Sequence, residues 1–223
     1  MTKNKENNES IKKMKGISKL ICNISKIGGI LIKIAMGCTI LAMIILPFII
    51  NKVEEVTDDT IIFNGKTYNY SLNDTILIID DYKEINNDIS VNRINNVIDM
   101  FQKKSNIEIT IIAEIMFICL IISLLFTYMV VRKVYKLFDN IHKGDTPFIE
   151  ENVTYIKQIA KMMIILLIFS KISDGIFGPL FNFQSESVAY IDLVEIVYVL
   201  VIFALAYVFE YGYKLQLEQD TTL

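Results

Sequence analysis

The sequence predicts an all-α membrane protein with four transmembrane helices, both termini in the cytoplasm, and a small mixed extracellular insertion between helices 1 and 2. Hydrophobic residues make up 53% of the 223 residues, yet 21% are charged. A chain with both properties must keep its charges apart from its apolar segments. Ile34 to Ile50 and Ile115 to Val131 are each free of charge for 17 residues, close to the length that crosses a bilayer.

Four spans are predicted, at about residues 29–50, 109–131, 159–181 and 188–209. The third span is interrupted by Lys171 and Asp174, and the fourth carries Asp192 and Glu195 near its start. Ionisable groups inside a bilayer are costly unless they face protein, water or an interface. The last two segments therefore cross the membrane only if these side chains find such surroundings.

Charge asymmetry sets the predicted orientation. Residues 1–26 contain seven lysines and two acids, whereas residues 51–108 contain six basic and eleven acidic residues. Positive charge favours the cytoplasmic ends of spans. We therefore expect a multi-pass protein of the cytoplasmic (plasma) membrane. It has an acidic outer loop at 51–108, a basic inner loop at 132–158 and a cytoplasmic tail at 210–223.

Residues 1–28 form a predicted basic cytoplasmic segment, separate from the four-span membrane domain at 29–223. At helical spacing one face is apolar and the opposite face gathers lysines; the apolar face consists of Ile17, Leu20, Ile21, Ile24 and Ile27. One interpretation is a helix lying on the anionic inner leaflet, attracted by its lysines. The other is a cytoplasmic extension of the first span, with lysines that only set the topology.

The outer loop contains hairpin signals. Asn64-Gly65 lies between two β-prone runs, Ile61 to Phe63 and Lys66 to Tyr70, which is typical of a type I′ turn, and Thr75 to Asp80 adds a third predicted strand. Past Ser90, apolar residues recur at helical spacing and predict a helix that leads into the second span. The nearby acids lack the spacing of a calcium loop and are interpreted as a solvated face; they are Asp80, Asp81, Glu84 and Asp88.

The inner loop is interpreted as a structural turn. His142 and Lys143 suit the last turn of a helix, Gly144 suits a left-handed C′ position, and Pro147 begins the next turn. Phe148 is expected to pack back, and Thr146 to cap the next helix. A second hypothesis is that this loop, including Glu151 and Asn152, docks a cytoplasmic partner. A catalytic pairing of His142 with Glu150 is disfavoured.

Five ionisable residues form the predicted polar cluster of the outer half of the membrane domain: Lys171, Asp174, Glu195, Asp192 and Glu114. Lys171 and Asp174 are three residues apart and can pair on one helix face. The cluster is either a ligand or ion site, or a structural ion pair with acids that reach the outer surface. The sequence leaves both interpretations open.

Motifs for catalysis, metals and cofactors are lacking in the sequence. His142 is the only histidine, the three cysteines form no C-x-x-C pair, and no Gly-rich phosphate loop occurs. Ser170 and Lys171 are adjacent, so on a helix they point about 100° apart and form no dyad. We expect no enzymatic activity, no metal and no cofactor.

Two stretches carry a family resemblance: LFDNIHKGDTPFIEENVTYIKQIA (137–160) and FEYGYKLQLEQDTTL (209–223). Their pattern combines Gly144, Pro147-Phe148 and Glu151-Asn152-Val153 with a tail motif of Phe209, Gly212, Leu215 and Asp220. It resembles the uncharacterised bacterial membrane-protein family known as domain of unknown function 2975. The resemblance implies a small multi-span protein, often associated with small helix-turn-helix regulators, and no established chemistry.

The sequence thus favours a membrane-anchored regulatory or interaction protein. The alternative is a small oligomeric transporter or a membrane protein that protects against a toxin or peptide through the polar cluster. Expected partners are a bilayer with an anionic inner leaflet, a small helix-turn-helix regulator and a second copy of the chain. No direct binding of nucleic acid is expected.

Overall fold

The computed structural model describes residues 2–57, 60–73, 76–79, 82–86, 98, 100–144, 146–177 and 193–221. The chain divides into two compact units. Unit 1 comprises Met1–Met36, Ile122–Lys171 and Tyr190–Leu223, and unit 2 comprises Gly37–Ile121 and Ile172–Ala189.

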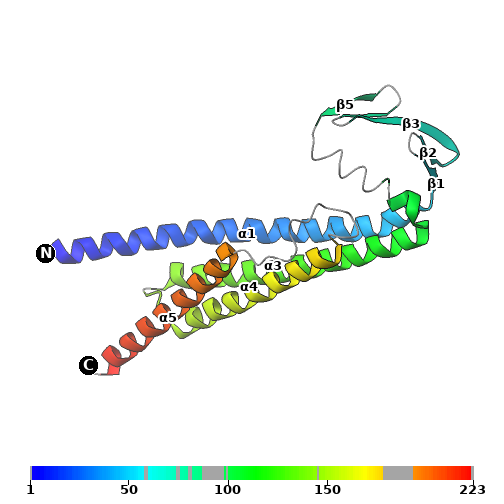
Figure 1. Cartoon of the computed structure of the whole chain (residues 1–223). Coiled ribbons are helices and arrows are strands. Elements are labelled where there is room, and N and C mark those ends of the chain that lie inside the picture. Colours follow the sequence, from blue (N-terminus) through cyan, green and yellow to red (C-terminus); the bar gives the residue numbers. More distant parts are fainter. Residues whose placement is uncertain are drawn as a thin grey trace. The chain divides into compact units, whose positions relative to one another are not determined.

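The described chain is mostly helical. Its long helices are α1 (Thr2–Ile50), α3 (Asn106–Lys143), α4 (Glu150–Phe177) and α5 (Leu193–Thr221) (Figure 1). Among the described residues, three helical segments are long and apolar enough to cross a membrane: Ile11–Ile50, Asn106–Lys143 and Leu193–Gln219. The lengths and compositions of these three segments indicate a membrane protein, as the sequence predicts.

The predicted third span, at about 159–181, overlaps α4. This helix is not among the three candidate spans. It carries Lys157, Lys161, Lys171 and Asp174 within its 28 residues, and the predicted span runs past Phe177, beyond the described part. The four-span topology therefore stays a prediction.

Helix α1 joins the predicted N-terminal segment to the first span without a break. Its 49 residues extend about 74 Å at 1.5 Å per residue, more than twice the thickness of the hydrocarbon core. Of the predicted apolar face, Ile17, Leu20 and Ile24 are each 60% exposed, whereas Ser18 and Cys22 are buried. The amphipathic stretch is thus part of a longer helix that packs through a different face.

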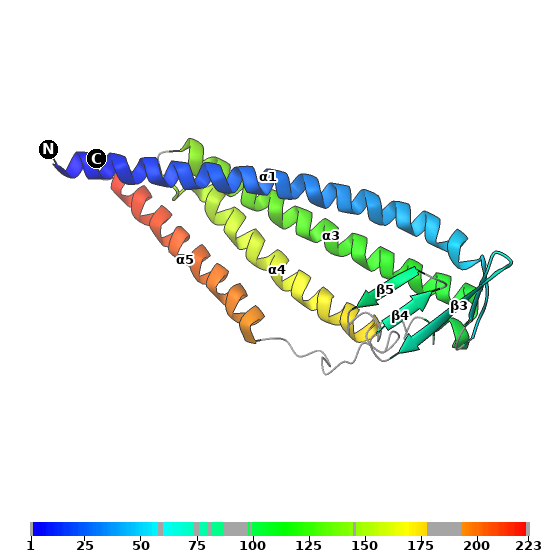
Figure 2. The same ribbon diagram turned by 90° about the horizontal axis from the view of Figure 1, so that it is seen from above.

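Unit 1 has its core where α3, α4 and α5 meet. Buried Leu137 and Ile141 from α3, Ile156 and Ile159 from α4, and Ala206 from α5 form one cluster. Met14 of α1 and Phe209 of α5 pack against this cluster. In Figure 2, α4 runs between α3 and α5, and the cluster explains this order because α4 contributes buried residues to both neighbours.

Unit 2 contains a five-stranded antiparallel sheet in the order β1-β2-β3-β4-β5, coloured cyan to green in Figure 1. The strands are β1 (Val53–Val56), β2 (Thr60–Phe63), β3 (Lys66–Asn73), β4 (Ile76–Ile79) and β5 (Tyr82–Asn86). Unit 2 also contains a small buried cluster of Ile50, Met100 and Ile109. In the expected mixed insertion, β1 to β5 form a meander, and residues 98 and 100–103 are helical.

The predicted Asn64-Gly65 hairpin is confirmed. Strands β2 and β3 pair with Phe63 opposite Lys66, and Asn64 and Gly65 have φ values of 51° and 73°. Positive φ at both central residues is the requirement of a type I′ turn. The predicted third strand is also present as β4, paired with β3.

Two other expectations for the outer loop reach beyond the described residues. The helix predicted past Ser90 is described only at 98 and 100–103, where it is helical. Of the four acids interpreted as a solvated face, Asp80, Asp81 and Asp88 lie outside the described part.

Helix α3 begins after Ser105. The Ser105 hydroxyl accepts a hydrogen bond from the Glu108 amide at 3.3 Å, and the Glu108 carboxylate accepts one from the Ser105 amide at 2.9 Å. This reciprocal pair is a capping box.

Candidate functional site

The inner loop begins where α3 ends. The amide of Gly144 donates to the carbonyl of Asn140 at 2.8 Å, and the Lys143 ammonium binds the Asp139 carboxylate at 2.6 Å. His142 contributes a contact that the sequence did not predict: its Nδ1 lies 3.1 Å from the backbone oxygen of Lys15 in α1. His142 therefore joins the end of α3 to α1.

The expected left-handed conformation of Gly144 is wrong. In the described chain, only Gly65 among the glycines has positive φ. The loop instead folds closely over the helix end: a Cβ on Gly144 would lie 3.0 Å from the Asn140 oxygen and 3.4 Å from the Thr146 oxygen. Close backbone approach, rather than handedness, explains the glycine.

Thr146 also differs from its expected role. Its hydroxyl accepts a hydrogen bond from the Phe148 amide at 3.2 Å, a turn within the loop, and does not cap the first turn of α4. It donates to the side-chain oxygen of Gln216 in α5 at 3.0 Å. The hydroxyl thereby connects the inner loop to the tail.

Asn152 is linked to the inner loop by a buried hydrogen bond. It is fully buried, and its Nδ2 donates to the Pro147 carbonyl at 2.9 Å, whereas its Oδ1 has no hydrogen-bond partner. Its neighbour Glu151 is exposed and accepts from Asn140 Nδ2 at 3.0 Å. Burying an amide side chain without a hydrogen bond costs free energy, and the bond to Pro147 removes part of that cost. The same bond ties Asn152 of α4 to the turn that precedes the helix.

Phe148 brings the two halves of the family pattern together. Its ring packs on Phe209 of α5, with ring centroids 5.3 Å apart and planes tilted by 60°. The same ring covers Gly212, where an added Cβ would lie 2.5 Å from the nearest ring carbon. The inner-loop Pro147-Phe148 pair and the tail motif are therefore parts of one structure. Leu215 is exposed beside them, and the side chain of Asp220 lies outside the description.

An open groove runs along this junction, here called the tail groove. It encloses about 680 Å³. It is lined by Thr146 and Phe148 of the inner loop and by residues of α5, namely Val208, Tyr211, Gly212, Leu215, Gln216 and Gln219. The lining combines apolar and aromatic surface with amide and hydroxyl groups, which is the composition of a binding groove.

One ion pair attaches α5 to α4 beside the groove. Lys157 of α4 lies 2.8 Å from the Glu210 carboxylate of α5, and Lys214, also of α5, lies 3.5 Å from the other Glu210 oxygen. All three side chains are partly exposed, so the ion pairs stabilise the junction only modestly.

The predicted polar cluster is only partly assembled. Lys171 lies 3.3 Å from Glu195, with side chains 22% and 40% exposed. Asp174, which the spacing allows to pair with Lys171, is exposed and forms none of the ion pairs in the described chain. Glu195 Oε2 is buried and makes no aligned hydrogen bond, so the contact with Lys171 is a charge contact only.

The other two members of the predicted cluster are Glu114 and Asp192. Glu114 is half-buried on α3 and belongs to unit 2, whereas Lys171 and Glu195 belong to unit 1. Asp192 lies outside the described residues. Ser170, considered as a nucleophile, donates to the Leu167 carbonyl at 2.9 Å. Within the residues described, no three His, Cys, Asp or Glu side chains gather as a metal site would require.

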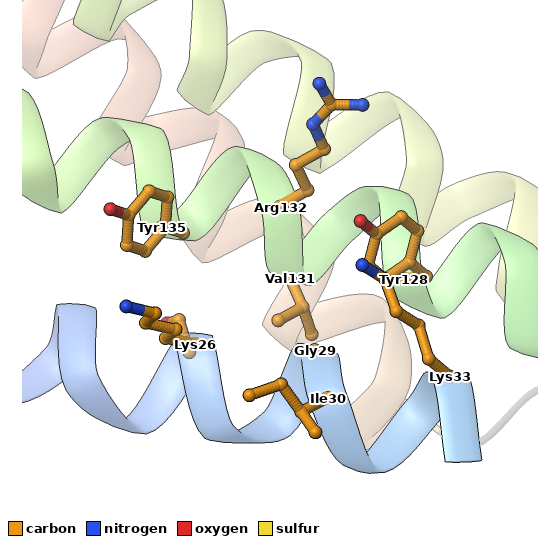
Figure 3. Close-up of a pocket in the computed structure, with 9 residues that line it drawn as sticks. Lys26, Gly29, Ile30, Lys33, Tyr128, Val131, Arg132 and Tyr135 are labelled. Carbon is orange, nitrogen blue, oxygen red and sulfur yellow. The ribbon is translucent and has the colours of Figure 1, made fainter. Parts of the chain in front are cut away.

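A second cavity was not anticipated from the sequence. It lies between α1 and α3, encloses about 370 Å³, and is lined by lysines, an arginine and two tyrosines. Figure 3 shows these side chains on the two facing helices. A signal for it exists in the sequence, because Lys26 and Lys33 share the seven-residue spacing of Tyr128 and Tyr135.

Comparison with known proteins gives a family match. The sequence model described as Protein of unknown function (DUF2975) matches residues 77–223, which extends the resemblance upstream into the outer loop. No curated protein matches the chain, and no solved structure matches it.

Proposed function

The chain belongs to the DUF2975 family of proteins of unknown function, and from its own geometry we propose that it is a membrane-anchored regulatory or interaction protein. The tail groove is the observation that carries this proposal. It is built from the two stretches that define the family pattern, and a buried asparagine, a ring stack and an interhelical ion pair hold its walls. Such a preorganised surface favours recognition of another macromolecule.

The proposed partner is a cytoplasmic protein that offers an apolar helix. Along α5, Tyr211 and Leu215 are four residues apart and exposed by 66% and 48%, so they form one ridge beside the groove. An amphipathic helix that binds in an apolar groove contacts such a ridge through its own apolar residues at helical spacing. The family resemblance points to a small helix-turn-helix regulator as this partner. In the proposal the regulator, rather than this chain, contacts nucleic acid.

The proposal includes a plasma-membrane location with four spans and both termini in the cytoplasm. This arrangement places the inner loop and the tail on the cytoplasmic side, where a regulator is found. Positive charge in residues 1–26 and 132–157 supports that orientation.

Site-specific photocrosslinking in cells tests the proposal. A photoreactive amino acid at position 215 is expected to capture a small DNA-binding protein, and Leu215→Glu is expected to abolish co-purification of that protein. Leu217→Glu is the matched control, because Leu217 is 49% exposed on the same tail but does not line the groove. Equal capture from positions 215 and 217, or capture of this chain alone, would contradict the proposal.

One observation favours the alternative function, a small oligomeric transporter or protective membrane protein. Lys171 and Glu195 place an ion pair between α4 and α5, and the buried Glu195 Oε2 has unused hydrogen-bonding capacity for a ligand. Lys171→Met and Glu195→Gln test it in a strain that depends on the protein. Unchanged flux and unchanged toxin resistance would rule this alternative out.

A further inference from the structure

The cavity between α1 and α3 is a positively charged pocket, here called the lysine–tyrosine pocket. Its lining from α1 is Ser25, Lys26, Gly29, Ile30 and Lys33, and its lining from α3 is Tyr128, Val131, Arg132 and Tyr135. All nine residues belong to unit 1. The volume of about 370 Å³ falls in the range of small-ligand sites.

The cations of this pocket lack acidic partners. Lys26, Lys33 and Arg132 form none of the ion pairs in the described part of the chain, whereas five other lysines of unit 1 each lie within 3.5 Å of a carboxylate. These paired lysines are Lys13, Lys143, Lys157, Lys171 and Lys214. Like charges held near one another repel, and a bound anion removes that repulsion. The pocket therefore has the electrostatics of an anion site.

The lysines and tyrosines face each other in pairs. Lys26 and Lys33 are seven residues apart, as are Tyr128 and Tyr135, and seven residues return a helix to nearly the same face. Lys33 Nζ lies 5.2 Å from the centre of the Tyr128 ring. In Figure 3, Lys26 points toward the Tyr135 side of the pocket, and the guanidinium of Arg132 points away from both lysines. We therefore assign ligand contacts to the lysines and tyrosines.

Of the two adjacent glycines Gly28 and Gly29 in α1, Gly29 lines the pocket. An added Cβ on Gly28 or Gly29 would lie 4.0 Å from Val131 or 3.7 Å from Tyr128, which is ordinary contact, so close packing of the helices does not demand glycine here. A glycine inside a helix is less stable than an alanine at the same position. Helix packing therefore does not require glycine at position 29, and the missing side chain leaves space in the pocket.

The pocket lies at the boundary between apolar and charged sequence. The first charge-free window begins at Ile34, directly after Lys33, and the second ends at Val131, directly before Arg132. Two boundaries that are far apart in the sequence thus meet in one pocket. In a bilayer this level is the headgroup layer, where tyrosines also concentrate and where lipid phosphates are found.

We propose that the lysine–tyrosine pocket binds the phosphate of an anionic phospholipid headgroup. Lys26 and Lys33 supply the charge, and the hydroxyls of Tyr128 and Tyr135 donate hydrogen bonds to the phosphate oxygens. Basic pockets between membrane helices recognise phospholipid headgroups in this way. The inference does not depend on the function proposed above, because it uses neither the tail groove nor a protein partner.

The test uses the full chain purified in detergent micelles, with phosphatidylglycerol or phosphatidylcholine added and retained lipid measured by native mass spectrometry. The wild type is expected to retain phosphatidylglycerol in preference to phosphatidylcholine. Lys26→Gln with Lys33→Gln, and separately Gly29→Leu, are expected to weaken retention of phosphatidylglycerol by about tenfold or more. Tyr128→Phe with Tyr135→Phe, which removes only hydroxyls, is expected to weaken it less.

Matched controls separate the pocket from diffuse attraction. Lys12→Gln with Lys19→Gln removes the same charge from exposed positions of α1, and Gly37→Leu adds the same side chain where nothing lies within 4 Å. Both controls are expected to retain lipid as the wild type does. Equal loss in the lysine controls, or full retention in Gly29→Leu with an unchanged thermal unfolding profile, would overturn the proposal. Displacement of the lipid by inorganic phosphate at equal concentration would also overturn it, because the site would then bind free phosphate.

Discussion

At the residue scale, Phe148 and Gly212 explain why two distant stretches of sequence form one pattern. The ring of Phe148 occupies the space that a side chain at position 212 would need, and the same ring packs against Phe209. Neither contact follows from local sequence, since it joins the inner loop to the tail. The sequence indicated the residues through the family resemblance but did not indicate that they touch.

Gly212→Ala is predicted to destabilise the protein by about 1 to 3 kcal/mol, the usual cost of overpacking. The added Cβ would lie 2.5 to 2.9 Å from three carbons of the Phe148 ring, so the ring must leave Phe209. Thermal unfolding in detergent, together with the rate of proteolysis at the inner loop, measures the effect. Gly175→Ala is the control and is expected to be neutral or stabilising, because nothing lies within 4 Å of that Cβ.

A double-mutant cycle makes this prediction specific to the ring. Phe148→Ala removes the clash, so Gly212→Ala should cost little more when it is added to Phe148→Ala. Additive losses in the double mutant would show that Gly212 matters for another reason.

At the element scale, local chemistry decided which parts of the fold were predictable. The Asn64-Gly65 hairpin is correct because its turn type depends on two adjacent residues. Strands β1 and β5 were not predicted, since β1 forms only through pairings such as Val53 with Phe63, which no local pattern specifies. The conformation of Gly144 was predicted wrongly: its amide bonds to Asn140, as in a left-handed cap, yet Gly65 is the only described glycine with positive φ.

The hairpin prediction can be tested at Gly65. With φ at 73°, Gly65→Ala is expected to destabilise the β2–β3 pairing by about 1 kcal/mol through the Cβ strain of the left-handed region. Amide hydrogen exchange of β2 and β3 should accelerate, while exchange in α3 and α5 stays unchanged. Lys66→Ala, one residue further on in an exposed strand position, is the control. Faster exchange in that control than in Gly65→Ala would contradict a type I′ turn.

At the scale of the whole molecule, the predicted orientation constrains the number of membrane crossings. Met14 of α1 and Phe209 of α5 pack against one buried cluster, and the four-span prediction places both residues at the cytoplasmic side. A chain that leaves and returns to the same side crosses an even number of times. Three candidate spans are an odd number. If α1, α3 and α5 all cross, α4 must therefore cross as well, with Lys171 facing Glu195 instead of lipid.

Cysteine labelling tests this parity directly. In a chain with Cys22, Cys38 and Cys119 replaced by serine, single cysteines are introduced as Lys12→Cys, Leu217→Cys and Lys66→Cys and exposed to a membrane-impermeant maleimide. The four-span arrangement predicts labelling at position 66 in intact cells, and labelling at positions 12 and 217 only after permeabilisation. Because three crossings would place residues 12 and 217 on opposite sides, labelling of just one of these two in intact cells would exclude the four-span arrangement and remove α4 from the membrane.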